Sequence, residues 1–265
     1  HFKTFFSSVY FWDILRNTLG LSLYYIAASF PAAIILALMI NQITAMRFRR
    51  AFQTILYLPH FISTVVMVGL LLIWLSPSSG LVGAFYRLLG KEAPNVMTSA
   101  SGFPSIYVWS DIWEPQLFLQ KDALFDDLYV WSGVWQTTGY SSVIFIAALA
   151  GVDPALHEAA TLDGATRLQR LIHVNIPAIM PTIVVMLIMT LGGIMNLSME
   201  KILLMQNDTN LMVSEVIATY VYKLGIQKAQ YSLSTAVGLF NNVINLLLLV
   251  SVNWFSRKVN ETSLW

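Results

Sequence analysis

Side chains that could do chemistry are few in this chain, and most of them lie between apolar segments. The sequence has 265 residues, of which 14 are Asp or Glu, 15 are Lys or Arg, four are His and none is Cys. The lack of cysteine excludes disulfides and thiolate chemistry, and the four histidines have no metal-binding spacing. The sequence also contains no GxxxxGK[ST] loop, so ATP hydrolysis is not expected in this chain. One charged segment, residues 151–175, remains as the most informative.

Residues 151–175 combine helix-start and helix-stop signals with a surface of very small side chains. Asp153 is suited to cap a helix whose first residue is Pro154, and Gly164 is suited to end that helix. A second helical run follows, which predicts two short helices joined at a glycine. Such a surface lets another backbone approach closely, while flanking charges fix its register, although an ordinary helix–turn–helix remains the alternative. The candidate docking residues are Glu158, Ala159, Ala160, Asp163, Gly164, Ala165 and Arg167.

The rest of the composition indicates a membrane protein. Hydrophobic residues make up 57% of the chain and charged residues only 11%, whereas soluble domains carry about 25% charged residues. A net charge of +1 gives no reason to expect nucleic-acid binding. A spanning helix needs about 20 mostly apolar residues. We therefore expect one all-α transmembrane domain over residues 1–265, with five spans at about 17–41, 55–75, 128–150, 176–197 and 231–255.

Basic residues in short loops predict the orientation of these spans. Arg47, Arg49 and Arg50 lie in a short turn without acidic residues, which is typical of the cytoplasmic side. This assignment places loop 151–175 in the cytoplasm, and loops 76–127 and 198–230 outside. Five spans that end inside must begin outside, and neither a signal peptide nor an initiator Met precedes the first residue. We therefore expect a sixth helix upstream of this sequence.

Several short segments resemble one family of membrane proteins. Glu158-Ala159-Ala160, Asp163-Gly164-Ala165 and Ile176-Pro177 are similar to the EAA loop of permease subunits in binding-protein-dependent ABC importers. A second set looks like the oligosaccharide and polysaccharide branch, which is maltose-type or alginate-transport-like: Arg16-Asn17-Thr18, Tyr57-Leu58-Pro59-His60-Phe61 and Thr262-Ser263-Leu264-Trp265. The resemblance extends over essentially the whole chain. Val174 and Ile176 depart from it slightly, because the family pattern favours other aliphatic residues there.

The resemblance implies a type I ABC importer bundle in the bacterial cytoplasmic (inner) membrane. In such importers the EAA loop is a coupling helix that sits in a groove of a cytoplasmic ATPase subunit. ATP and Mg are then bound by two separate ATPase subunits, and a second, distinct permease completes the pathway. An extracytoplasmic solute-binding protein delivers the saccharide. This chain is then a transport subunit without a cofactor, not an enzyme.

A saccharide pathway needs polar partners for hydroxyls and aromatic faces for sugar rings. The candidates near the span ends are Trp131, Trp135, Tyr140, Asn196, Glu200, Asn241 and Asn245. Asn241 and Asn245 lie one turn apart on the same helix face. Structural roles remain open for all of them, because intramembrane Asn often bonds a neighbouring helix and Trp often lies at the membrane interface. His60 is interpreted as a packing residue near a kink.

Other functions remain as alternatives. A membrane-embedded enzyme acting on glycans or lipids would need a cluster of acid, base or metal ligands, which the sequence does not show. A channel or ion-coupled carrier is disfavoured by spans without charged residues, while an ABC permease for a non-sugar solute stays open. Residues 106–114 are repeated in part at 128–136, and we interpret the first copy as a local duplication at the outer membrane surface. Residues 213–224 predict a short helix within loop 198–230.

Overall fold

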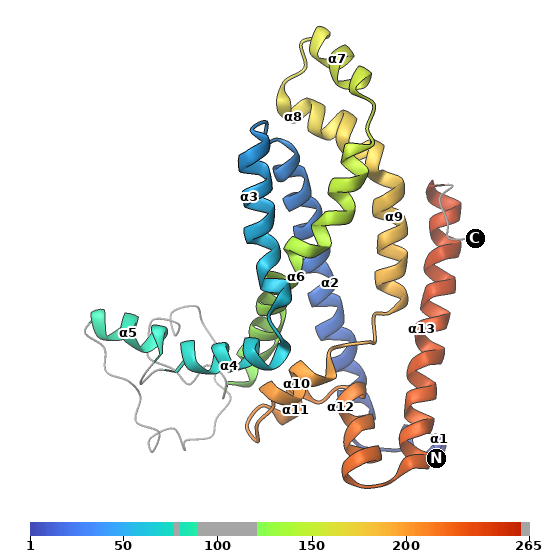
Figure 1. The fold of residues 1–265 in the computed structure, drawn as a ribbon. Coiled ribbons are helices and arrows are strands. Elements are labelled where there is room, and N and C mark those ends of the chain that lie inside the picture. Colours follow the sequence, from blue (N-terminus) through green and yellow to red (C-terminus); the bar gives the residue numbers. More distant parts are fainter. Residues whose placement is uncertain (77–79, 90–120, 261–265) are drawn as a thin grey trace.

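The structure, a computed structural model, describes residues 1–76, 80–89 and 121–260. All regular structure in these ranges is helical and forms an elongated bundle (Figure 1). Its long elements are α2 (Phe11–Asn41), α3 (Met46–Tyr57), α6 (Asp122–Ala150), α9 (Ile176–Gly192) and α13 (Tyr231–Asn260). One end of the bundle carries α7 (Pro154–Leu162) and α8 (Arg167–Arg170). The opposite end carries α1 (Phe2–Phe6), α10 (Met199–Met205), α11 (Leu211–Ser214) and α12 (Ile217–Tyr222).

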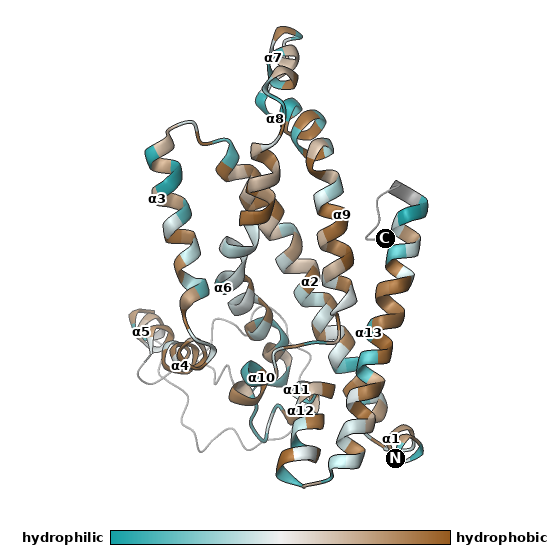
Figure 2. Cartoon of the chain, turned by 45° about the vertical axis from the view of Figure 1, so that its right-hand side comes forward, coloured by the Kyte–Doolittle hydropathy of each residue, from teal (hydrophilic) through white to brown (hydrophobic). Residues whose placement is uncertain are grey.

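Three helices in the described ranges are long and apolar enough to cross a membrane: Phe11–Asn41, Arg167–Gly192 and Tyr231–Lys258. Two bent pairs pass the same test together: Met46–Phe61 with Thr64–Trp74, and Asp122–Ala150 with Pro154–Leu162. The total is five when each pair counts as one span, which agrees with the number expected from the sequence. Figure 2 shows apolar residues along the middle of α9 and α13, with more polar residues toward the ends of α13.

The expected span at 55–75 is not one continuous helix. α3 runs into a short 3-10 turn, Leu58–Phe61, and α4 (Thr64–Trp74) then leaves at an angle of 93°. Pro59 has no N–H to continue the helix, and the Ser63 side chain caps α4 by accepting from the backbone N–H of Val66 at 3.3 Å. Gln136 donates to the free carbonyl of Ile62 at 2.7 Å. The break is therefore built by local signals and closed by a contact from α6.

Other boundaries also differ from the predicted ones. α6 begins at Asp122, six residues before the expected span, and α2 begins at Phe11. α8 continues through a π-helical turn, Leu171–Asn175, directly into α9, so the second helix of loop 151–175 is the beginning of the next span. The single helix expected within 198–230 is replaced by α10, α11, α12 and a π-helical turn, Lys223–Gln227. The first copy of the repeat, 106–114, lies outside the described residues, as does the closing 262–265 motif.

Helix pairing concentrates on α2 with α6 and on α9 with α13. A Cβ atom added at Gly139 would lie 2.0 Å from the carbonyl oxygen of Leu56, so only glycine allows α6 to approach α3 this closely. Farther toward the α7 end, Ala37 on α2, Phe145 on α6 and Ile179 on α9 meet in one buried cluster. This cluster fixes the base from which α7 and α8 project.

Candidate functional site: the elbow and the polar break

The elbow, residues 153–170, is folded by its own capping residues. Asp153 Oδ1 accepts from the backbone N–H of Ala155 at 2.9 Å, and Pro154 begins α7. Gly164 has a φ of 78°, a left-handed conformation that strongly favours glycine. Thr166 and Gln169 then form a capping box that begins α8. The prediction of a capped helix that ends at Gly164 is confirmed.

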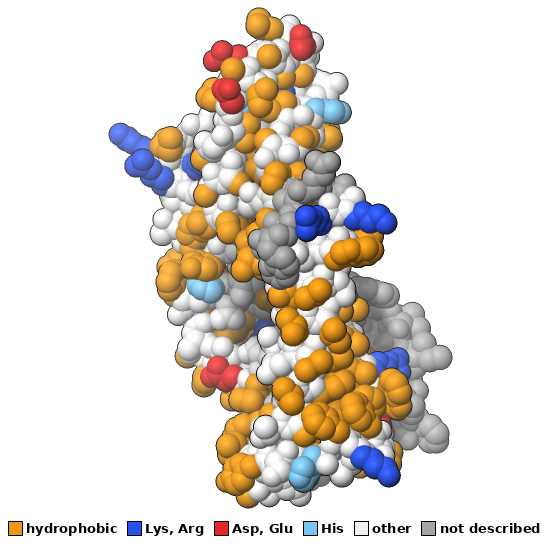
Figure 3. Space-filling model, turned by 90° about the vertical axis from the view of Figure 1, so that its right-hand side faces the viewer, with side chains coloured by type: hydrophobic (Ala, Val, Ile, Leu, Met, Phe, Trp, Pro, Cys, Tyr) orange, Lys and Arg blue, Asp and Glu red, His pale blue; other side chains and the backbone are white. Residues whose placement is uncertain are grey.

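The elbow protrudes and buries none of its helical residues in the rest of the chain. Neither α7 nor α8 contains a buried residue, and Leu162 is 89% exposed. Figure 3 shows acidic side chains at the tip of the molecule, over α7, with basic side chains below them. Glu158 and Asp163 are exposed, and neither forms an ion pair within the described residues. An exposed leucine among unpaired acids on a projecting helix suits contact with a second protein.

All seven candidate docking residues lie within the elbow, either on α7, in its turn or at the beginning of α8. Arg170 Nη1 donates to Thr161 Oγ1 at 2.8 Å, which links α8 to α7 across the turn. Because α8 continues through the π-helical turn into α9, the elbow is continuous with a candidate spanning helix, residues 167–192.

The polar break, residues 193–201, lies at the other end of the same helix. The Oδ1 atom of Asn196 accepts from Asn241 Nδ2 at 3.3 Å and from Asn245 Nδ2 at 3.1 Å. Asn245 Oδ1 in turn accepts from the backbone N–H of Met195 at 3.2 Å. Asn241 Oδ1 is buried and has no hydrogen-bond partner among the described residues. Three of the candidate pathway residues thus form one network, with a buried acceptor left over.

Lys201, at the α10 side of the polar break, is a charged residue that sequence reasoning missed. It is 5% exposed, and its Nζ donates to the carbonyl of Tyr129 at 2.9 Å and lies 4.8 Å from the ring of that residue. No ion pair joins Lys201 to a carboxylate in the described ranges. Burial lowers the pKa of Lys201 to about 8. Its hydrogen-bond partner lies 72 residues away, so local spacing gave no signal of its burial.

Aromatic and polar groups surround Lys201. The hydroxyl groups of Tyr25 and Thr137 lie 3.1 Å apart in a hydrogen bond, and Tyr129 accepts a bond from the backbone N–H of Ser198 through its own hydroxyl. A Cβ atom at Gly133 would lie 2.7 Å from the Tyr25 ring and 3.2 Å from Lys201 Nζ. The glycine therefore leaves the space that the lysine and tyrosine side chains occupy.

The remaining candidate pathway residues lie apart from this network. Trp131 donates through Nε1 to the Tyr24 hydroxyl at 3.0 Å, and with Trp135 it lines an apolar groove beside α4. Tyr140 stacks on His60, with ring centroids 4.0 Å apart and planes 4° from parallel. His60 is thus a packing partner at the break after α3, as interpreted from the sequence. Glu200 is exposed and joins no network in the described residues.

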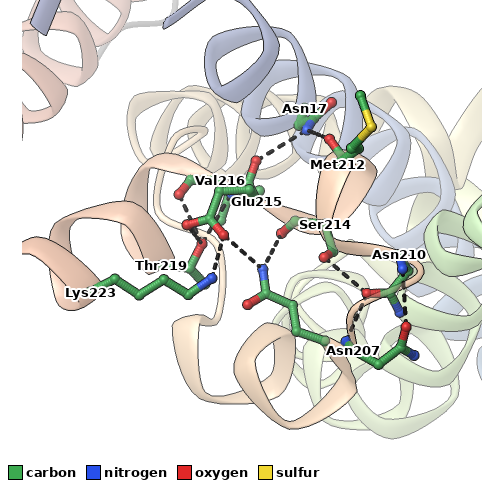
Figure 4. Close-up of polar contacts among 10 residues, drawn as sticks. Asn17, Asn207, Asn210, Met212, Ser214, Glu215, Val216, Thr219 and Lys223 are labelled. Atoms are coloured by element: carbon green, nitrogen blue, oxygen red, sulfur yellow. Dashed lines mark hydrogen bonds and ion pairs between the residues drawn. The ribbon is translucent and has the colours of Figure 1, made fainter. Parts of the chain in front are cut away.

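A cluster at the end of the bundle opposite the elbow fixes the N-terminal part of α2 (Figure 4). Asn17 Nδ2 donates to the carbonyls of Met212 at 2.7 Å and Glu215 at 3.1 Å. The Glu215 carboxylate accepts from Lys223, Thr219 and Gln206. Thr18 Oγ1, fully buried, accepts from the backbone N–H of Ile217 at 3.0 Å. Asn17 and Thr18, singled out by the family resemblance, therefore anchor the segment between α11 and α12.

Comparison with known proteins identifies the family. Residues 29–261 match the family described as "Binding-protein-dependent transport system inner membrane component". The chain belongs to this family. It is 34% identical over its whole length to protein LplB of Bacillus subtilis (strain 168), and it covers 76% of that protein. It is 35% identical, with the same coverage, to the polygalacturonan/rhamnogalacturonan transport system permease protein YteP of that organism.

Two solved structures have the same fold. One is a bacterial ABC transporter involved in the import of the acidic polysaccharide alginate, with a TM-score of 0.87, 37% identity, and coverage of 98% of this chain and 83% of the other. The second is a bacterial alginate ABC transporter in complex with an alginate pentasaccharide-bound periplasmic protein, with a TM-score of 0.86, 38% identity, and coverage of 100% and 84%. The expected family and all-helical importer fold are confirmed. The chain is a multi-pass transport component rather than an enzyme.

Proposed function

We propose that this chain is the membrane-spanning permease subunit of an ATP-driven importer of oligo- or polysaccharide, coupled to its ATPase through the elbow. One observation carries the proposal. The elbow is folded by its own caps, projects from the bundle, and leaves Leu162 and Glu158 exposed. A segment of this kind is suited to a groove on another protein. The family that the sequence matches supports this reading.

The mechanism follows from the continuous helix between the elbow and the polar break. Residues 167–192 form 26 residues of helix, which at 1.5 Å per residue is roughly 39 Å long. When the ATPase subunits close on ATP, they move the elbow, and α9 transmits this movement to Asn196 at its far end. There the Asn241 and Asn245 contacts exchange, which opens or closes the pathway in an alternating-access cycle.

The proposed importer needs partner proteins in addition to this chain. Two ATPase subunits bind ATP and Mg, and a second permease, a distinct homologue, completes the pathway. In the bacterial cytoplasmic membrane, the end that carries α10 to α12 faces the outside of the cell. The solute-binding protein delivers saccharide at this end. This orientation agrees with Arg47, Arg49 and Arg50 at the elbow end.

Lys201 suggests which saccharides the chain accepts. A buried ammonium without a carboxylate partner is costly, and one carbonyl satisfies only one of its three N–H groups. A uronate carboxylate in the pathway would supply the missing counter-charge. The names of two similar proteins refer to the acidic polysaccharides alginate and polygalacturonan. We therefore assign an acidic oligosaccharide as the substrate class, with Lys201, Asn196, Asn241 and Asn245 as its candidate contacts.

The test is ATP-dependent uptake by the complete transporter in proteoliposomes, supplied with its binding protein. Gly164→Val forces a β-branched residue into the left-handed region, and we expect at least a tenfold loss of uptake with the helical content unchanged. Gly151→Val is the matched control, because Gly151 lies at the base of the elbow, has a φ of −87° and leaves room for a Cβ atom. Equal uptake by Gly164→Val and the wild type would contradict coupling through the elbow. Uptake of a non-sugar solute alone would contradict the substrate class.

A further inference from the structure

A cavity of about 280 Å³ lies between the elbow and the end of α2. In Figure 1, α8 lies next to the turn that joins α2 to α3, below α7. Every residue that lines the cavity is polar or basic: Asn41, Gln42, Thr44, His157, Arg167, Arg170 and Asn175. The cavity is slightly smaller than the range of about 300–1,000 Å³ typical of drug-sized ligands. Its size and lining suit a small, charged group.

The charges around this cavity are of one sign. Two guanidinium groups and one imidazole line it, and no carboxylate does. The side chain of Arg167 makes no hydrogen bond or ion pair within the described residues, while that of Arg170 uses one of its five donors on Thr161. Arg49 reaches Asn41 Oδ1 at 3.5 Å and adds a third guanidinium near the rim. Neighbouring cations without counter-charges repel one another, so an anion in the cavity would stabilise this arrangement.

Asn175 shows what else the occupant must supply. It is 1% exposed, it ends the π-helical turn, and its Oδ1 has no donor among the described residues. A buried acceptor left without a donor is destabilising, because it has lost its hydrogen bond to water. An anion without hydrogen-bond donors would satisfy the N–H groups of the two arginines. It would not satisfy Asn175 Oδ1, which accepts only from a hydroxyl or an N–H. The occupant therefore combines an anionic group with a hydrogen-bond donor.

The position of the cavity points to a lipid. The apolar helix α2 ends at Asn41, where the cavity begins, so the cavity lies at the depth of the headgroups in a bilayer. Arg47 and Arg50 are exposed nearby, at the beginning of α3. Basic pockets at this depth bind the headgroups of anionic lipids. Phospholipids whose headgroup carries free hydroxyls, of the phosphatidylglycerol type, have both required groups.

We propose that this cavity binds the headgroup of a phosphatidylglycerol-type lipid. Arg167 and Arg170 hold the phosphodiester, and Asn175 Oδ1 accepts from a glycerol hydroxyl. His157, Arg167 and Arg170 belong to the elbow, whereas Asn41, Gln42 and Thr44 lie at and just after the end of α2. The lipid therefore ties the elbow to the bundle. The lipid then influences how far the elbow moves when the ATPase pulls on it.

The experiment measures lipid binding by the complete transporter in neutral detergent, with short-chain phosphatidylglycerol as the probe. Phosphatidylcholine, phosphatidic acid and inorganic phosphate serve as competitors. We expect saturable binding, no competition by phosphatidylcholine or by a 100-fold excess of phosphate, and weak competition by phosphatidic acid, which lacks the headgroup hydroxyls. Binding does not require transport, so the proposal can fail while the proposed function stands.

Three variants locate the site. Arg170→Gln should weaken binding at least tenfold, whereas Arg47→Gln removes the same charge outside the cavity and should change binding less than twofold. Asn175→Leu should reduce the preference for phosphatidylglycerol over phosphatidic acid to about one. The lipid affinity of a variant is interpreted only when its unfolding temperature equals that of the wild type. Arg170→Lys should retain part of the affinity.

Three results would overturn the proposal. Equal losses in Arg170→Gln and Arg47→Gln would show general attraction to the basic surface. Full competition by inorganic phosphate would identify a free anion as the ligand. Binding by the permease pair alone, but not by the complete transporter, would show that an acidic side chain of the ATPase fills the cavity.

Discussion

The elbow and the polar break lie at the two ends of one helix, residues 167–192, yet they are held in opposite ways. Within the elbow, side-chain hydrogen bonds span at most nine residues, and its helices bury nothing. At the polar break, the bonds that reach α6 and α13 span 45 to 72 residues. The elbow is therefore organised before it meets a partner, whereas the break exists only when three helices are assembled. Under the proposed mechanism, the elbow can thus bind its partner as a preformed unit, and the polar break can change when the helices move relative to one another.

The largest effect is expected from removing the amide at the centre of the break. Asn245→Leu leaves the buried N–H of Met195 without an acceptor and removes one donor to Asn196. A loss of about 2–3 kcal/mol in the free energy of unfolding follows. Unfolding of the purified transporter in detergent measures it. Asn242→Leu, at an exposed position three residues earlier on the same helix, is the control and should change stability by less than about 0.5 kcal/mol; equal losses would refute the long-range role.

The long-range hydrogen bond between Thr18 and Ile217 should make a smaller contribution to stability, which a pair of matched variants can measure. Thr18→Val keeps the shape of the side chain but removes the acceptor for the buried Ile217 N–H. We expect a loss of about 2 kcal/mol. Thr18→Ser retains the hydroxyl and should lose less. If the two variants were equally unstable, packing rather than the hydrogen bond would hold α2 to α12.

Lys201 extends the comparison to substrate. Lys201→Met should lower the ratio of uptake for an acidic oligosaccharide over its carboxyl-reduced, neutral counterpart about tenfold, equivalent to about 1.4 kcal/mol. The binding protein is the same in both complexes, so its own preference cancels in the comparison with wild type. An unchanged ratio would assign Lys201 a purely structural role.

The pH dependence of the same ratio gives an independent test. The pKa of Lys201 is lowered to about 8 by burial, so its charge, and with it the acid preference, should fall as the outside pH rises through 8. Lys201→Arg should keep the preference, because a guanidinium stays charged. Lys201 adjoins the rings of Tyr25 and Tyr129 and forms no ion pair with a carboxylate among the described residues. A preference that stays constant in the wild type from pH 7 to pH 9 would contradict the role of the ammonium.

The contribution of Lys201 to stability has the opposite sign. The unfolded chain binds the extra proton between about pH 8 and 10.5, the ordinary pKa of a lysine, so folding becomes more favourable as the pH rises across that range. Unfolding of the purified transporter at pH 7.5 and pH 9.5, in parallel with Lys201→Met, measures this difference. The increase in the free energy of unfolding between these two pH values should be smaller in Lys201→Met than in the wild type.

The smallest effect is expected within the elbow. Thr166→Ala removes the cap of α8 and should cost about 1 kcal/mol, but only locally, because α8 contains no buried residue. Hydrogen exchange should show faster exchange over residues 166–170, with the unfolding temperature of the bundle unchanged. Thr166→Ser should restore protection. A global loss of stability would contradict the autonomy of the elbow.

The same contrast explains what could be predicted from the sequence. Asp153, Pro154 and Gly164 act on their neighbours, so the beginning and end of α7 were predictable from residue types alone. The 93° bend after Phe61 was not, because apolar periodicity does not report direction and the contact from Gln136 lies 74 residues away. Asn241 and Asn245 were predicted to share a face, but their meeting with Asn196 required the turn after Gly193. Lys201 was missed because its partner, Tyr129, is distant in sequence.

The most direct test of coupling through the elbow uses the absence of cysteine from the chain. Leu162→Cys introduces a single thiol at the exposed tip of the elbow, and Leu211→Cys introduces one at the opposite end. In intact cells, we expect the thiol at 162 to cross-link to the ATPase subunit and to resist a membrane-impermeant maleimide, while the thiol at 211 reacts with that reagent. Labelling of the thiol at 162 from outside, or failure to cross-link to the ATPase at any stage of the cycle, would contradict this coupling.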